Sequence, residues 1–174
     1  MCIAADLEGL LSRDHERLDT LLDVALRDDG TVDEVAYSEF RSGLLRHIGI
    51  EERLLFPEVR KRQGRSAIAD QLHRDHAALA ALLVPPPDAV QIGRIRALLE
   101  EHNPLEEGPD GLYRQVQALA GGDVPKLVAA IEVFPAIPVA PYADTPLLRQ
   151  TIEQLLREAE AGRRSVLFGY HTAD

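Results

Sequence analysis

The sequence predicts an all-α fold, namely an up-down-up-down four-helix bundle followed by a C-terminal helical extension. Apolar residues recur at helical spacing in four successive segments, and short stretches rich in glycine, proline and aspartate separate these segments. A chain of 174 residues, of which 45% are hydrophobic, is long enough for one domain with a sizeable core. Residues 1–120 are therefore expected to form the bundle, and residues 121–174 the extension packed on it.

The first two predicted helices are joined by a polar turn around Gly30. The first is expected over about residues 6–26. Its core-facing stripe consists of Leu7, Leu11, His15, Leu18 and Leu22. Thr31, with Glu34 three residues later, has the spacing of a capping box, so the second helix is expected to begin there. Its stripe consists of Phe40, Leu44, His47, Glu51 and Leu55. Pro57 predicts a disturbance near its end, because proline lacks a backbone N–H.

The third and fourth helices are delimited by Gly64 and by the three consecutive prolines 85–87. The stripe of the third consists of Ile68, Leu72, His76, Leu79 and Leu83. Asp88 follows the prolines and is expected to open the fourth helix. The stripe of the fourth consists of Ile95, Leu98, Leu99 and His102. Four amphipathic segments with short connections are typical of antiparallel bundle neighbours.

The extension combines helices with a proline-rich segment. A short helix is expected from Pro125 to Glu132, and residues 134–142, with three prolines, are expected to form an apolar loop wrapped on the bundle. Thr145 and Pro146 are a good N-cap and first-turn pair. They predict a last helix that runs to about residue 161.

Composition excludes several classes of function. The formal net charge of -10 argues against sequence-independent nucleic-acid binding, which needs a basic surface, and against adsorption to anionic membranes. No apolar run approaches the ~18 residues of a transmembrane helix. The single cysteine, Cys2, excludes an intramolecular disulfide and suits a reducing compartment. We therefore expect a cytoplasmic protein with neither a nucleic-acid nor a membrane partner.

Two short patterns occur twice in the same order: Asp-His-x-x-Leu, then His-x-x-x-Glu-Glu. The first copy occupies residues 14–18 and 47–52, and the second copy residues 75–79 and 102–107. Each histidine falls on a core-facing stripe, and residues four apart share a helix face. Burying such polar groups without partners costs on the order of a few kcal/mol each, and metal coordination satisfies all of them. The predicted metal ligands are His15, His47, Glu51, His76, His102 and Glu106.

The depth of these residues along the helices supports one common layer. His15 precedes Gly30 by fifteen residues and His47 follows it by seventeen, so at ~1.5 Å per residue they lie at similar heights. Imidazole and carboxylate donors without a thiolate suit iron, manganese or zinc. Two carboxylates able to bridge a pair of ions inside a bundle favour two iron ions, with manganese or zinc as less favoured occupants.

On these residues the chain resembles the hemerythrin-like proteins, a family named for its His-His-Glu cation-binding signature. The resemblance covers about residues 5–113 and includes the run at residues 51–57. It implies an oxo- or hydroxo-bridged di-iron centre in which Glu51 and Glu106 bridge the ions and the four histidines are terminal ligands. It also implies binding or sensing of oxygen, nitric oxide or peroxide. The alternatives are a di-iron enzyme acting on peroxide or nitric oxide, and an iron-sensing or interaction module.

Two departures from the family pattern concern the second copy. Oxygen-carrying members have a further histidine four residues before the third one, where this chain has Leu72. His73 lies three residues before His76 and is a further candidate metal ligand; the alternative is a surface position or a hydrogen bond to a ligand. Pro104 could kink the helix and displace Glu106, but Glu106 remains the expected ligand.

The acidic residues beside the motifs are expected to be solvated or to pair helices rather than bind metal, although Glu107 could substitute for a displaced Glu106. They are Asp14, Glu52, Asp75 and Glu107. Nothing in the sequence places Tyr113 or Tyr142 at the centre.

Overall fold

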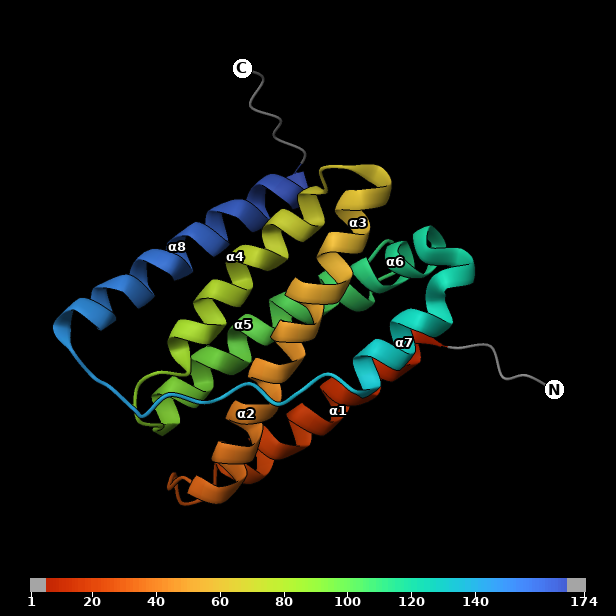
Figure 1. Ribbon diagram of the computed structural model, residues 1–174. Helices are drawn as coiled ribbons and strands as arrows, with labels where there is room; N and C mark the ends of the chain where they lie inside the picture. The colour runs from red at the N-terminus through yellow and green to blue at the C-terminus, as the bar shows by residue number, and fades with distance from the viewer. Residues whose placement is uncertain (1–5, 169–174) are drawn as a thin grey trace.

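The computed structural model describes residues 6–168, so Cys2 lies outside the described range. Within this range the protein is helical and has no β-strand, which confirms the predicted all-α class. Four long helices lie side by side as the bundle (Figure 1). They are α1 (Leu7–Ala25), α2 (Glu34–Ile50), α4 (Ala67–Leu82) and α5 (Ala89–Glu107). None of the described helices is long and apolar enough to cross a membrane.

Aspartate and serine side chains begin the bundle helices. Asp6 caps α1, Ser66 caps α4 and Asp88 caps α5, each through a hydrogen bond from a first-turn N–H. The predicted Thr31 cap of α2 is wrong. Asp33 accepts hydrogen bonds from the first-turn N–H groups of α2 instead, while the hydroxyl and N–H of Thr31 bond to the preceding turn.

The second bundle helix continues through Pro57 by widening one turn. The five-residue π-helix η1 (Glu51–Leu55) follows α2 directly and leads into α3 (Phe56–Gln63). In this turn the N–H of Phe56 bonds to the carbonyl of Glu51, five residues earlier. Such π-turns are frequent at functional sites, and here the turn begins at a predicted ligand.

The C-terminal part of the chain adds a fifth long helix. Helix α8 (Pro146–Phe168) lies along α4 on the outside of the bundle (Figure 1). Its cap is the predicted one, because Thr145 Oγ1 accepts the N–H of Leu148 at 3.1 Å, although the helix is longer than expected. Ile152 and Ala159 are buried against the bundle.

Short helices and an extended segment connect α5 to α8. Helix α6 (Leu112–Ala120), the single turn η2 (Gly121–Asp123) and α7 (Val124–Glu132) pack near α1 and α3 (Figure 1). Residues 133–145, here called the strap, then cross the bundle to α8.

Helix α2 holds the strap along its length. Arg46 donates hydrogen bonds to the carbonyls of Ile131 and Phe134 at 2.9 and 3.0 Å. Farther along the strap, the Arg41 guanidinium lies 4.4 Å from the centre of the Tyr142 ring, within the range of a cation–π contact. The predicted loop on the bundle surface is therefore present.

The hydrophobic core falls into two clusters. One includes Leu18, Leu22, Phe40, Leu44, Leu79 and Ile95. The other includes Leu11, Ile50, Leu55, Phe56, Leu72 and Leu112. The histidines of the doubled pattern lie between them along each bundle helix; on α1, for example, His15 separates Leu11 from Leu18. A polar layer thus divides the apolar interior.

We expect Gly49→Leu to destabilise the fold by about 1–3 kcal/mol, as overpacking of a core usually does. A side chain on buried Gly49 would meet Ile137 and the ring of Phe134, so the strap must move. The control is Gly93→Leu, because Gly93 also lies in a helix but has open space around it. This variant should be as stable as the wild type or more stable, since leucine favours a helix more than glycine does. Denaturant unfolding of both variants measures the difference; equal stability would show that the strap does not rest on α2.

Candidate metal centre

Each of the four bundle helices places one histidine in the polar layer, and two of them add a glutamate. The six residues are His15, His47, Glu51, His76, His102 and Glu106. All six are buried, and the most exposed of them, His15, keeps 8% of its surface accessible. Sequence spacing therefore identified residues that the fold brings together.

These side chains form two overlapping groups, and in each group the ligand atoms lie within 4.8 Å of one another. The first group consists of His15, His47, Glu51 and Glu106. The second consists of Glu51, His76, His102 and Glu106. Each group has two imidazoles, and both groups share the two carboxylates, so the layer offers two adjacent metal positions.

The shared carboxylates turn one oxygen toward each group. The oxygen-to-Nε2 distances are 3.4 Å from Glu51 Oε1 to His47, 3.1 Å from Glu51 Oε2 to His76, 3.2 Å from Glu106 Oε2 to His15 and 2.8 Å from Glu106 Oε1 to His102. A carboxylate that presents separate oxygens to two positions is arranged to bridge two cations.

Three buried atoms show that the layer needs a further partner. Glu51 Oε2, His76 Nε2 and Glu106 Oε1 have no hydrogen-bond partner of acceptable geometry within residues 6–168. Such atoms cost about 1–3 kcal/mol each when left unsatisfied. A cation between them would satisfy all three, and nitrogen and carboxylate donors without sulfur suit iron, manganese or zinc. The residues present therefore fit a metal site.

Every histidine of the layer is held at its other ring nitrogen by a carboxylate. The Nδ1-to-oxygen distances are 2.6 Å for His15 with Glu107, 2.9 Å for His47 with Asp14, 2.8 Å for His76 with Glu52 and 3.3 Å for His102 with Asp75. Such a partner fixes the tautomer and aims Nε2 at a metal. The sequence prediction that these acids are solvated or pair helices missed this role, and Asp75 is fully buried.

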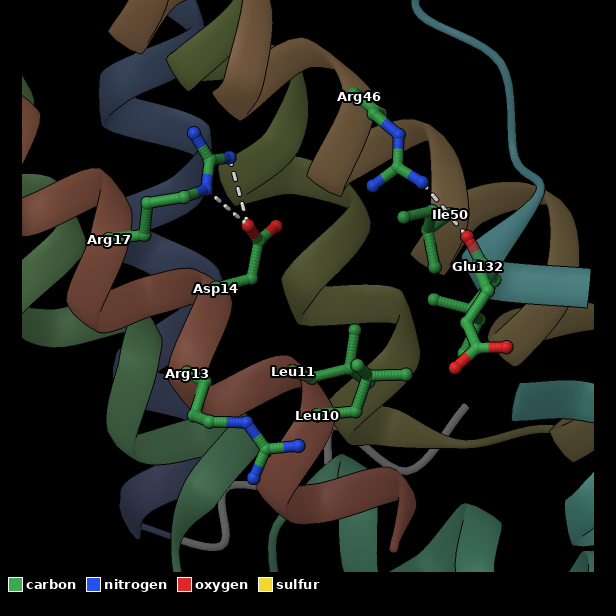
Figure 2. Close-up of a pocket in the computed structure, with 9 residues that line it drawn as sticks. Leu10, Leu11, Arg13, Asp14, Arg17, Arg46, Ile50 and Glu132 are labelled. Atoms are coloured by element: carbon green, nitrogen blue, oxygen red, sulfur yellow. Dashed lines mark hydrogen bonds and ion pairs between the residues drawn. The ribbon is translucent and has the colours of Figure 1, made fainter. Parts of the chain in front are cut away.

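Asp14 connects the layer to the surface. Its Oδ2 faces His47, whereas its Oδ1 accepts a hydrogen bond from Arg17 at 2.9 Å. Burial alone would raise the pKa of Asp14, but His47 and Arg17 lower it to about 2. Figure 2 shows Asp14 and Arg17 at the edge of a pocket, whose apolar wall includes Leu11 and Ile50. The volume of this pocket is about 290 Å³.

Asp75 connects the layer to the C-terminal helix. Its Oδ1 accepts a hydrogen bond from Gln71 at 2.8 Å and pairs with the guanidinium of Arg163 on α8. Gln71 also donates to the carbonyl of Ala159, so α8 is bonded to the part of α4 whose Asp75 contacts His102. The sequence held no signal for this contact, because Arg163 is 88 residues away from Asp75.

One comparison with known proteins bears on this geometry. The family profile described as Hemerythrin HHE cation binding domain matches residues 6–109. The chain belongs to this hemerythrin family. No curated protein and no solved structure shows significant similarity to it. The matched range contains all six residues of the layer, whereas α6, the strap and α8 lie beyond it.

The structure leaves His73, a predicted ligand, outside the centre of this hemerythrin domain. The core position one turn before His76 is Leu72, which is fully buried. The side chain of His73 is 62% exposed, and its Nδ1 lies 2.9 Å from Glu52 Oε1. His73 therefore touches a carboxylate that holds His76, which corresponds to the alternative of a residue that contacts the site from the surface.

Pro104 does not displace Glu106, which stays in the layer as expected. Helix α5 continues through it to Glu107, and Glu106 remains fully buried in the layer. Proline lacks the N–H that would bond to the carbonyl of Glu100, but its own carbonyl accepts the N–H of Gly108 at 3.0 Å. Glu107, the expected substitute, holds His15 instead.

Tyr113 is a member of the centre that sequence reasoning missed. It lies on α6, just beyond the residues matched to the family, and is fully buried. Its hydroxyl donates to Glu51 Oε1 at 2.8 Å. Burial and the charges of Glu106 and Glu51 raise its pKa well above the usual value. The only signal was its place on an apolar helix face beside Leu112 and Val116.

The buried carboxylates control the charge of the histidines. Burial alone would lower the pKa of His15, but hydrogen bonds to Glu106 and Glu107 raise it to about 10. Burial opposes protonation of His47 as well, and Glu51 and Asp14 raise its pKa to about 9. Both pKa values lie above neutral pH, so the carboxylates favour the protonated forms of these two imidazoles when no metal is bound.

We expect the melting temperature of the metal-free protein to fall as pH rises from about 6.5 to 10. A histidine whose pKa is raised on folding stabilises the fold below its ordinary pKa of 6.5, and this contribution disappears as pH passes the folded value, about 9 for His47 and 10 for His15. Metal ions replace these protons, so the difference in melting temperature between loaded and metal-free protein should widen with pH.

Calorimetry of both forms across this range measures the effect. His15→Gln is the control, because it removes one of the raised groups and should make the metal-free decline shallower. A metal-free melting temperature that stays constant or rises over the same range would contradict the charge assignment.

We expect Glu52→Gln to weaken metal binding by about 10- to 100-fold, the usual cost of losing a partner that orients a ligand. The amide keeps the shape but removes the charge opposite His76 Nδ1. Glu58→Gln is the matched control, because Glu58 pairs with Arg62 away from the layer. Competition with a chelator measures both dissociation constants; equal values would contradict the role given to Glu52.

Proposed function

We propose that this hemerythrin-family protein holds two iron ions in the polar layer and binds dioxygen, nitric oxide or peroxide there. The observation that carries the proposal is the sharing of Glu51 and Glu106 by two histidine pairs. Paired carboxylates and histidines projecting from facing helices are typical of two-iron centres in bundles. The single cysteine of the chain supports a reducing, cytoplasmic setting.

The room beside the layer supports a small ligand. A cavity of about 10 Å³ lies against His15, His47 and His102. A volume of this order accommodates a molecule about the size of water. Asn103 also lines the cavity, and its buried Oδ1 has no hydrogen-bond partner among the described residues. The Asn103 amide is thus available to bond to a small polar ligand.

The protein's own residues would perform three tasks. Glu51 and Glu106 would bridge the ions, and the four histidines would complete their coordination at Nε2. The two apolar clusters above and below the layer keep bulk water away from it. The outer carboxylates hold the rings in place and carry the Nδ1 protons. Bound iron would supply an electron donor and an open coordination position for the small ligand.

We expect the wild-type protein, loaded anaerobically with ferrous iron, to bind about two ions per chain and to gain visible absorption on exposure to oxygen. His76→Ala should lose at least one ion and most of the spectral response, because His76 belongs to the second group. His73→Ala is the control and should match the wild type, since His73 is exposed. Metal analysis with absorption spectroscopy measures both properties.

The same experiment separates the alternatives. A protein that holds two zinc ions, with no spectral response of its iron form to oxygen, nitric oxide or peroxide, would contradict the proposal. Steady turnover of peroxide or nitric oxide that is lost in His76→Ala would identify an enzyme instead. Loss of helicity on chelation, without ligand binding, would identify an iron-sensing module in which metal mainly folds the bundle.

A further inference from the structure

The hydroxyl of Tyr113 faces the first group of metal-binding residues from one side. Its oxygen lies 2.8 Å from Glu51 Oε1 and 3.1 Å from both His15 Nε2 and His47 Nε2. It also lies 3.2 Å from Glu106 Oε2. These four atoms come from the four residues of the first group. Tyr113 is therefore in contact with all four residues of one metal position, although the two groups themselves consist only of histidine and glutamate.

We propose that Tyr113 is itself a metal ligand, the fifth donor at the position formed by His15 and His47. This inference rests on the proposed metal function and extends it to a residue beyond the matched family domain. Donor atoms at right angles around one ion, with bonds of ~2.1 Å, lie about 3 Å apart. The distances from the phenol oxygen fit this spacing as well as the 2.9 Å between His15 Nε2 and His47 Nε2 does.

The hydrogen bonds of the metal-free layer also direct the phenol oxygen at this position. A hydroxyl has one proton to donate, and the closest acceptor for it is Glu51. The lone pairs of the phenol oxygen are then left on the side of His15 Nε2 and His47 Nε2, each 3.1 Å away. A cation held by these two imidazoles would lie on the same side of the phenol oxygen.

The second metal position has a different neighbour. There Phe56 stacks on the ring of His76, with the ring centres 5.5 Å apart and the planes 8° from parallel. Phenylalanine offers no donor atom, so the second group keeps four protein ligands. Tyr113 thus makes the two positions chemically unequal, with five protein donors at one and four at the other.

Coordination as phenolate is balanced without any oxidant or reductant. The bond from the phenol oxygen to the metal forms as the O–H bond breaks, and the proton leaves to solvent. Metal ligands bind in their deprotonated form, so loading releases one more proton per chain than it would without this ligand.

The test compares Tyr113→Phe with Tyr37→Phe. Tyr37 is the matched control, because it is also fully buried and its hydroxyl has no hydrogen-bond partner within the described range. With ferric iron, the wild type and Tyr37→Phe should show a phenolate-to-iron charge-transfer band that Tyr113→Phe lacks. With zinc, Tyr113→Phe should release about one proton fewer on loading than the other two proteins.

The ultraviolet spectrum of the wild type provides a further measurement that needs no variant. Zinc loading should produce the difference signal of an ionised tyrosine, whether or not Tyr113→Phe folds. If the wild type binds two ions without this signal, the inference is overturned and the proposed function stands. Equal spectra and equal proton release in all three proteins would have the same consequence. Failure of the wild type to bind iron would overturn the proposed function itself.

Discussion

Burial of a fully polar layer inside an apolar bundle is the constraint on which the rest of this structure depends. Four imidazoles and two carboxylates separate the two hydrophobic clusters, and each of these groups must be satisfied where water is excluded. The Nδ1 atom of each of the four histidines contacts an outer carboxylate, and the Nε2 atoms converge on Glu51 and Glu106. The helices are therefore fixed in rotation as well as position.

The doubled sequence pattern is explained by an exchange between its copies. Within a copy, the aspartate beside the first histidine holds the second histidine, as Asp14 does for His47. Between copies, the second glutamate of each pair holds the first histidine of the other, as Glu52 does for His76. Periodicity predicted which residues face the core. It could not reveal these contacts, because they depend on how neighbouring helices are rotated about their axes.

Other features were hidden for similar physical reasons. Proline chemistry correctly predicted a disturbance at Pro57, where a π-turn keeps the helix continuous. It could not decide the effect of Pro104, where the helix loses one hydrogen bond and Glu106 stays in the layer. Tyr113 reaches the layer only because α6 turns back toward α1 and α3. Arg163 contacts Asp75 across 88 residues. Tertiary contacts of this range leave no trace in local spacing, whereas helix class and core positions do.

The pairing of Asp75 with Arg163 makes the C-terminal helix a thermodynamic partner of the metal centre. A buried carboxylate deprived of its cation is strongly destabilised, and this one also orients His102. Undocking of α8 and loss of alignment at His102 are therefore linked equilibria. A ligand or protein that binds better to one arrangement of α8 therefore changes the metal affinity of the centre. By thermodynamic reciprocity, metal binding changes the affinity for that ligand or protein by the same factor.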